Sequence, residues 1–217
     1  MDTVLSQDRS NVLDEVIARR RSARVFTSEI PPKALIQQII LAGLQAPYAG
    51  LARKEDIPYR FFRVICQGPS IIKAAGLIQE QAKANLELLK AEMSKNAYLR
   101  ENGGAFVARV EQLAEHGLPS LRNAPYFIVV AERKGIPPVE FESLAHCLQN
   151  MWLKATALGL GFQLLSVTKM LTESREFFDM IGLQPGEFAV NGCVVGYPQQ
   201  PPAEKHLFSL DQVTAWL

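Results

Sequence analysis

A run of basic residues near the N-terminus is the part of this sequence best suited to bind an anion. The run contains Arg19, Arg20, Arg21, Ser22 and Arg24. A guanidinium group can donate two parallel hydrogen bonds to a phosphate, and a serine hydroxyl adds a further donor. If the chain is extended after the third arginine, Ser22 and Arg24 share one face with Phe26 beneath them. The run therefore predicts a phosphate site, although arginines also close helices, whose C-terminal ends attract cations.

The elements that must position this run are predicted from hydrophobic periodicity. A first helix is expected from about residue 8 or 10 to 21, with an apolar stripe at Leu13, Val16 and Ile17. A second helix follows to about residue 45, and Pro47 ends it. The small residues of 46–50 then form a loop where backbone can approach a ligand closely.

Four apolar segments are predicted to be strands, at residues 60–66, 126–131, 162–167 and 187–195. The segment 70–117 is rich in helix and forms either a lid over a site or part of the scaffold. A helix over 139–158 is apolar nearly all round, so it is buried in the core or against a partner. Strands mixed with long helices favour an α+β fold or a three-layer α/β sandwich.

Composition limits the function classes. The 217 residues are 48% apolar and 21% charged, which is typical of one globular domain or a compact pair. A net charge of +1 argues against a broad nucleic-acid surface. Three scattered cysteines indicate a reducing compartment, and the absence of a secretory pattern or a long apolar run predicts a cytoplasmic protein away from membranes. The tail, residues 199–217, carries apolar residues that need a surface to cover, for example on another chain.

Common catalytic motifs are missing from the sequence. It has no dinucleotide-binding glycine fingerprint, no P-loop and no nucleophile elbow. The histidines His116, His146 and His206 are too scattered to predict a metal site, and Ser166 has no evident triad partners. This pattern fits an enzyme whose chemistry belongs to a cofactor, and it fits a binding module equally well.

Several stretches together resemble the nitroreductase family of FMN-dependent oxidoreductases. Residues 20–26 are similar to its R-R-S-x-R-x-F signature, and residues 46–50 to its A-P-S-A-G-N loop. Residues 148–161 resemble the Q-N-x-x-L-x-A…A-L-G-L-G helix, and residues 194–198 the final strand with its G-Y-P turn. The four matches occur in the family's order.

The resemblance implies one nitroreductase-like FMN-binding domain over 1–217, with a helical excursion at 70–117 and a tail at 199–217. It implies a three-layer α/β/α sandwich around a mixed, mainly antiparallel sheet. It also implies a homodimer with FMN at the subunit interface, in which the helix at 139–158 is the central dimer helix.

The resemblance further implies which residues bind FMN. The phosphate and the ribityl–pyrimidine part would be contacted by Arg20, Arg21, Ser22 and Arg24. The isoalloxazine would lie along Leu164, Leu165 and Ser166, with a backbone N–H of that turn directed at flavin N5. The other subunit would contribute Pro47, Tyr48 and Ala49. Lys205 is the nearest candidate for a basic residue that reaches the phosphate, with a spacing one or two residues off; no side chain is assigned as catalytic.

The implied activity is a ping-pong transfer of electrons from NADH or NADPH through flavin N5 to a nitroaromatic, a quinone or a related small acceptor. Two alternatives stay open. One is a specialised flavin enzyme of the same fold, either a reductive dehalogenase or an enzyme that breaks down flavin with oxygen. The other is a protein that binds or delivers flavin without turnover.

The sequence also departs from the family pattern. Tyr48 and Leu51 replace the serine and the asparagine of the loop, and residues 54–61 replace the usual Q-P-W-x-F. The Tyr48 ring either stacks over the flavin or packs as an interface residue. Arg53 and Lys54 either attract an acidic substrate or remain solvated.

Overall fold

The computed structural model describes residues 6–48, 57–201 and 204–217. Its sheet has four strands, which are β1 (Arg60–Cys66), β2 (Tyr126–Arg133), β3 (Gly161–Leu164) and β4 (Phe188–Gly196). The order is β1-β2-β4-β3, and every neighbouring pair is antiparallel. A parallel bridge joins Ser22 to Phe162 at the outer edge of β3. The predicted mixed, mainly antiparallel sheet is therefore confirmed.

The two central strands are buried on both faces, which explains why their sequences are apolar almost throughout. Alternate residues of β2 point to opposite sides of the sheet. Phe127 and Val129 belong to one apolar cluster, whereas Ile128 and Val130 belong to the other.

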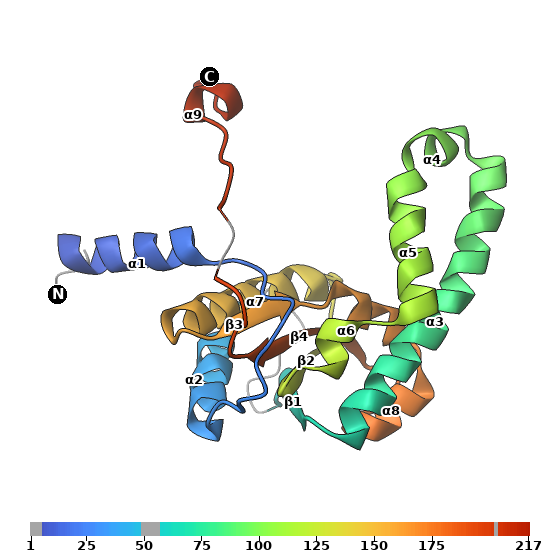
Figure 1. Ribbon diagram of the computed structural model, residues 1–217, viewed down its shortest axis with the longest axis horizontal. Helices are drawn as coiled ribbons and strands as arrows, with labels where there is room; N and C mark the ends of the chain where they lie inside the picture. Colours follow the sequence, from blue (N-terminus) through green and yellow to red (C-terminus); the bar gives the residue numbers. More distant parts are fainter. Residues whose placement is uncertain (1–5, 49–56, 202–203) are drawn as a thin grey trace.

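Helices cover both faces of the sheet, as Figure 1 shows. One face is covered by α2 (Lys33–Leu44) and α7 (Glu140–Ala157). The other face is covered mainly by α3 (Pro69–Lys95), α5 (Gly104–His116) and α8 (Arg175–Ile181). The three-layer α/β/α architecture is therefore confirmed.

The remaining helices are short, except for the first. They are α1 (Gln7–Arg19), α4 (Ala97–Asn102), α6 (Pro119–Arg122), the 3₁₀ helix η1 (Ser166–Leu171) and α9 (Leu210–Val213). Figure 1 shows α3 and α5 running side by side into a long hairpin capped by α4, away from the sheet. No helix in the described parts of the chain is long and apolar enough to span a membrane.

The apolar face of α7 is buried inside this one chain, which corrects a sequence-based expectation. Leu144, Cys147, Met151 and Ala155 are all fully buried, in the layer shared with α2 and the sheet. The expectation was that a partner subunit explains the apolarity of this helix better than a monomer core does. The fold of a single chain already covers this face, so its apolarity does not require a partner; the role of the helix in a dimer stays a prediction.

The third strand is shorter than predicted. An extended segment was expected to reach Val167, but β3 ends at Leu164 and η1 begins at Ser166. The N–H of Thr168 donates to the Leu165 carbonyl, which turns the chain into the 3₁₀ helix. An apolar run shows that a segment is buried, but it does not distinguish a strand from a short helix.

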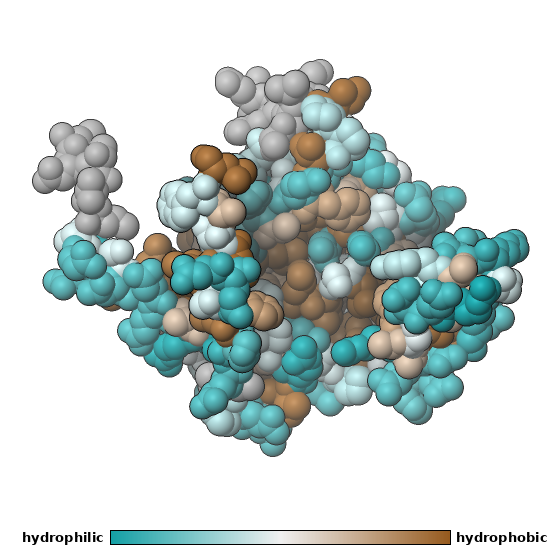
Figure 2. Space-filling view, turned by 90° about the horizontal axis from the view of Figure 1, so that it is seen from above, coloured by the Kyte–Doolittle hydropathy of each residue, from teal (hydrophilic) through white to brown (hydrophobic). Residues whose placement is uncertain are grey.

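Two segments at the chain ends are mostly exposed. Helix α1 contacts α7 but has no buried residue, and of the stripe predicted at Leu13, Val16 and Ile17 only Val16 is half-buried. Residues 204–217 are exposed throughout, and Trp216 is 96% exposed. Figure 1 shows both segments extending from the body. In Figure 2, apolar side chains gather in a hollow on the face from which the tail rises.

Candidate functional site

The arginine segment runs as an extra extended strand along the outer edge of β3. The N–H of Ala23 donates to the Phe162 carbonyl at 3.0 Å, and that of Thr27 donates to the Tyr197 carbonyl at 2.9 Å. A second isolated bridge pairs Phe26 with Pro198. Backbone pairing therefore brings together three segments that lie far apart in the sequence.

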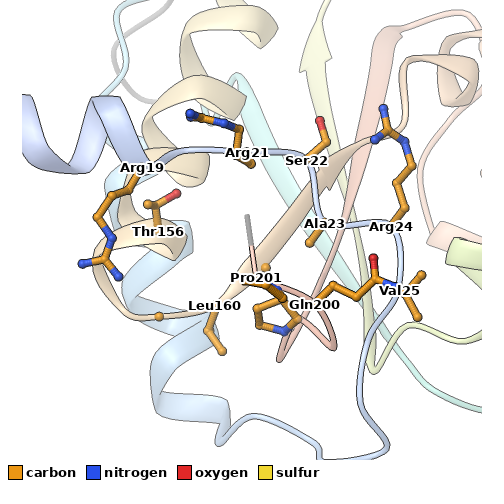
Figure 3. A pocket seen from close by; sticks show the side chains of 13 residues that line it. Arg19, Arg21, Ser22, Ala23, Arg24, Val25, Thr156, Leu160, Gln200 and Pro201 are labelled. Atoms are coloured by element: carbon orange, nitrogen blue, oxygen red, sulfur yellow. The ribbon is translucent and has the colours of Figure 1, made fainter. Parts of the chain in front are cut away.

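Side chains alternate along this segment as expected of an extended chain. In Figure 3, Ser22 and Arg24 extend together from one side, whereas Ala23 and Val25 point to the other, towards Gln200 and Pro201. Phe26 is buried and belongs to the apolar core. A hydroxyl and a guanidinium are thus presented side by side.

Two glycines allow the segment to approach the sheet closely. A Cβ atom at Gly161 would lie 2.6 Å from the Cβ of Ala23, and one at Gly196 would lie 2.9 Å from Phe26 Cδ1. Contacts below 3.0 Å are not found for real Cβ atoms, so any side chain at either position would push the segment away. The glycines at the start of β3 and at the end of β4 therefore determine where the arginines lie.

Helix α7 fixes the start of the segment through Trp152. The indole Nε1 donates to the Arg21 carbonyl at 3.2 Å, and the Arg20 guanidinium lies 4.3 Å from the centre of the indole ring. The ring also stacks on Phe162 with 5.2 Å between centroids. From the sequence, Trp152 was expected only to be an apolar residue of the helix. Nothing in the sequence indicated that it would contact Arg20 and Arg21.

The arginines differ in what they already contact. Arg19 pairs with Glu15 at 3.1 Å across one turn of α1, and Arg21 donates to the carbonyls of Ala18 and Arg20. Arg24 is exposed, and no carboxylate of the described chain pairs with it. An incoming anion would therefore meet Arg24 without displacing an acidic partner.

A cavity of about 460 Å³ adjoins the segment (Figure 3). It lies between the arginine segment, the end of α7 with the glycine turn, and the start of the tail. Its lining includes Arg19, Ala23, Thr156, Leu160, Gln200 and Pro201. Ser22 and Arg24 also line the cavity, although Figure 3 shows the Ser22 hydroxyl and the Arg24 guanidinium extending from the other side of the segment.

The turn after β3 is only partly available to a ligand. Leu165 is buried, and its N–H donates to the Gly192 carbonyl at 2.8 Å. Leu164 is 37% exposed, and Ser166 is exposed at the start of η1. If an N–H of this turn meets a ligand, it therefore does not belong to Leu165.

The loop after α2 lies beside the start of β1, away from the turn after β3. Pro47 is exposed, whereas the Tyr48 hydroxyl donates to the Arg133 carbonyl at 3.0 Å and its ring stacks on Tyr59, 4.3 Å away between centroids. Tyr48 thus packs on its own chain, and both of its interpretations, stacking over the flavin and packing at a subunit interface, stay predictions. Ala49, Leu51, Arg53 and Lys54 lie outside the described residues.

Lys205 is exposed in the tail and is not among the residues that line the cavity. The structure of one chain therefore brings Arg20, Arg21, Ser22 and Arg24 together, but it does not bring Lys205 or Pro47 to them.

Sequence reasoning missed the ion pair between Arg60 and Glu132, which is buried between the sheet and the end of α2. Burial raises the pKa of Glu132 to about 7, despite the opposing effect of Arg60, and the nearby Glu140 raises it further. The pair joins the first residue of β1 to the seventh of β2. In the sequence each residue looks like a polar residue at the end of a strand. Only the strand register, which places Arg60 opposite Glu132, reveals the pair.

Comparison with known proteins agrees with this arrangement. Residues 17–197 match the profile of the Nitroreductase family, and the chain therefore belongs to that family. Curated protein sequences give no significant match.

Solved structures share the fold at low sequence identity. A nitroreductase with bound FMN from Desulfitobacterium hafniense DCB-2 is 24% identical with a TM-score of 0.64, over 95% of this chain and 99% of that one. A nitroreductase with bound FMN from Bacteroides fragilis NCTC 9343 is 17% identical with a TM-score of 0.68, over 94% and 98%. A BluB-like flavoprotein from Clostridium difficile 630 is 19% identical with a TM-score of 0.70, also over 94% and 98%.

Proposed function

We propose that this protein is an FMN-dependent oxidoreductase that passes electrons from NADH or NADPH to a small acceptor, such as a nitroaromatic or a quinone. The observation that carries the proposal is the pair Ser22 and Arg24, which extend side by side from a segment held by β3, β4 and α7. Family membership and the FMN named in two of the similar structures support the choice of cofactor.

The donor set fits the phosphate of FMN. That phosphate is a dianion near neutral pH, and charge-assisted hydrogen bonds from guanidinium and hydroxyl groups offset the cost of burying it. Arg20 is held on Trp152 and Arg24 has no acidic partner in the described chain, so both can face an anion.

When bound, FMN supplies the redox chemistry by accepting a hydride from NAD(P)H and giving it to the second substrate. The residues of this chain would bind and orient the cofactor and shield it from water. Leu164 and Ser166 are exposed beside the arginine segment and can lie against an aromatic ring system. No side chain is required as a general acid or base.

The site is completed by a second copy of the chain in this proposal. In one chain Leu164 and Ser166 are open to solvent, α1 has no buried residue, and residues 204–217 of the tail are exposed. A homodimer covers these exposed residues and lets Pro47, Tyr48 and Ala49 of one copy approach the flavin of the other. Lys205, on the tail, can then reach a phosphate only through such packing.

We infer a cytoplasmic location from the cysteines. Cys66, Cys147 and Cys193 are all free thiols, which suits a reducing compartment.

Replacing Arg20 and Arg24 together with alanine tests the assignment. Each charge-assisted hydrogen bond contributes roughly 1.5–3 kcal/mol, so losing two should lower FMN affinity by about 100-fold or more, and the purified protein should be colourless. The variant Arg100→Ala with Arg175→Ala, two exposed arginines on α4 and α8, should stay yellow. Full FMN retention in the first variant contradicts the phosphate site.

Anaerobic reduction tests the activity. Addition of NADH or NADPH should bleach the yellow protein, and a quinone should restore the colour. A protein that neither nicotinamide bleaches is a flavin carrier and not an oxidoreductase.

A specialised flavin enzyme is a second candidate, supported by two observations. The BluB-like flavoprotein has the same fold, and the family serine is replaced by Tyr48, which packs on Tyr59. Irreversible loss of flavin absorbance when the reduced protein meets air would favour this candidate.

A further inference from the structure

A buried ion pair lies beneath the loop that follows α2. Arg60 faces Glu132 across the β1–β2 ladder, and its Nε donates to Glu132 Oε1 at 2.5 Å. The two side chains are 2% and 0% exposed. The other carboxylate oxygen of Glu132 has no hydrogen-bond partner in the described chain, so the carboxylate itself is incompletely satisfied.

The other donors of Arg60 hold the end of α2 and the start of the loop. Its Nη1 donates to the carbonyls of Gly43 and Ala46 at 2.8 and 3.1 Å, and its Nη2 donates to that of Pro47 at 3.2 Å. The last carbonyls of a helix have no partner within the helix and attract cations. Because α2 has no basic residue in its last turn, Arg60 supplies this charge from the neighbouring strand.

A second attachment follows directly. The Tyr48 hydroxyl donates to the carbonyl of Arg133, the residue after Glu132, and the Tyr48 ring stacks on Tyr59, the residue before Arg60. Residues 46–48 are therefore tied to the ends of both β1 and β2.

Fold stability alone does not account for this arrangement. Burying two charges is costly, and well-packed apolar residues of similar volume often give equal or greater stability. What apolar side chains cannot do is hold three carbonyl groups in fixed positions. A planar guanidinium with five donors does so, whereas a lysine, as a single point charge, does not.

We propose that Arg60 and Glu132 are positioning residues of the flavin site, which fix the backbone of residues 46–48 where this segment meets the flavin of the second copy. The inference rests on the proposed function, which assigns Pro47 and Tyr48 to the partner's site. Both side chains are buried, so they act through the backbone and not by contact with the cofactor.

The test uses Arg60→Met combined with Glu132→Leu, which removes both charges while keeping the core filled. The matched control is Arg63→Met on the same strand, because Arg63 Nε also donates to a carbonyl, that of Ile181 at 2.7 Å, away from the loop. FMN affinity is measured by quenching of flavin fluorescence. Backbone hydrogen exchange of residues 43–48 is measured by mass spectrometry without added FMN.

The double variant should bind FMN on the order of 10- to 100-fold more weakly, because small displacements of positioning groups are costly. Hydrogen exchange should become faster at residues 43–48 in this variant and not in the control. Unchanged affinity in the double variant, or an equal loss in Arg63→Met, overturns the inference. If the double variant does not fold, Arg60→Lys is judged by the same two measurements.

The two proposals fail separately. If the wild-type protein binds no FMN, the proposed function is wrong and the flavin part of the inference falls with it; hydrogen exchange then decides whether Arg60 and Glu132 fix the backbone of residues 46–48. Faster exchange confined to residues 43–48 then supports it, and unchanged exchange overturns it.

Discussion

Gly161 shows how one residue determines the position of the arginine segment. We predict that Gly161→Ala weakens FMN binding and lowers the free energy of unfolding by about 1–3 kcal/mol, because the added methyl group would overlap the Cβ of Ala23. Gly76→Ala is the control. Gly76 lies in α3 with open space around it, so alanine there should stabilise by about 0.5–1 kcal/mol. Urea unfolding measures both changes, and equal effects would contradict the close-packing argument.

Glu132 gives a prediction of pH dependence. Its pKa in the folded protein is raised to about 7, mainly by burial, above its ordinary value of 4.5. Between these values the folded chain binds more protons than the unfolded chain, so stability decreases as pH rises from about 4.5 to 7. The upper limit is about 3 kcal/mol, from roughly 1.4 kcal/mol for each unit of pKa shift.

The measurement compares wild type with Glu132→Gln in urea at several pH values. The difference in the free energy of unfolding between the two proteins should change between about pH 4.5 and 7, because the contributions of the other titrating groups cancel. A constant difference from pH 4.5 to 8 would mean that Glu132 stays ionised beside Arg60.

At the scale of elements, α7 connects the core to the site. Five of its apolar residues are buried with α2 and the sheet, while Trp152 reaches the arginine segment. We predict that Trp152→Phe, which keeps an aromatic ring but loses the hydrogen bond to Arg21, weakens FMN binding about fivefold to tenfold, as expected for one hydrogen bond. Trp152→Leu, which also loses the contact with Arg20, should weaken it further.

Flavin titration of the two variants measures this order of effects. Phe141→Leu, at an exposed position of the same helix, is the control and should bind as the wild type does. Equal affinity of all three variants would remove α7 from the site.

Elements also show the limits of local pattern. Residues 60–66 were predicted as a strand with the bounds that the structure has, because an apolar run between turn residues is a local signal. The 3₁₀ helix at Ser166 was missed, because its direction depends on the hydrogen bond from Leu165 to Gly192 of β4.

At the scale of the molecule, the exposed tail argues for assembly. Leu207, Phe208, Leu210, Val213 and Trp216 are all more than 60% exposed. We predict that a chain ending at Pro201 is monomeric and binds FMN poorly, whereas the full chain is a dimer. Light scattering after size exclusion measures the mass, and a truncated dimer with normal FMN affinity would contradict the role of the tail.

The sequence by itself determined the motif order, most of the elements and the residues that resemble a flavin phosphate site. These features are local, because periodicity and turn chemistry act over a few residues. Only the tertiary structure decided that α7 is buried in its own chain, that Trp152 supports Arg20 and that Arg60 holds the loop after α2. Those contacts join residues more than a dozen positions apart, and the strand register and helix packing that create them are properties of the whole folded chain.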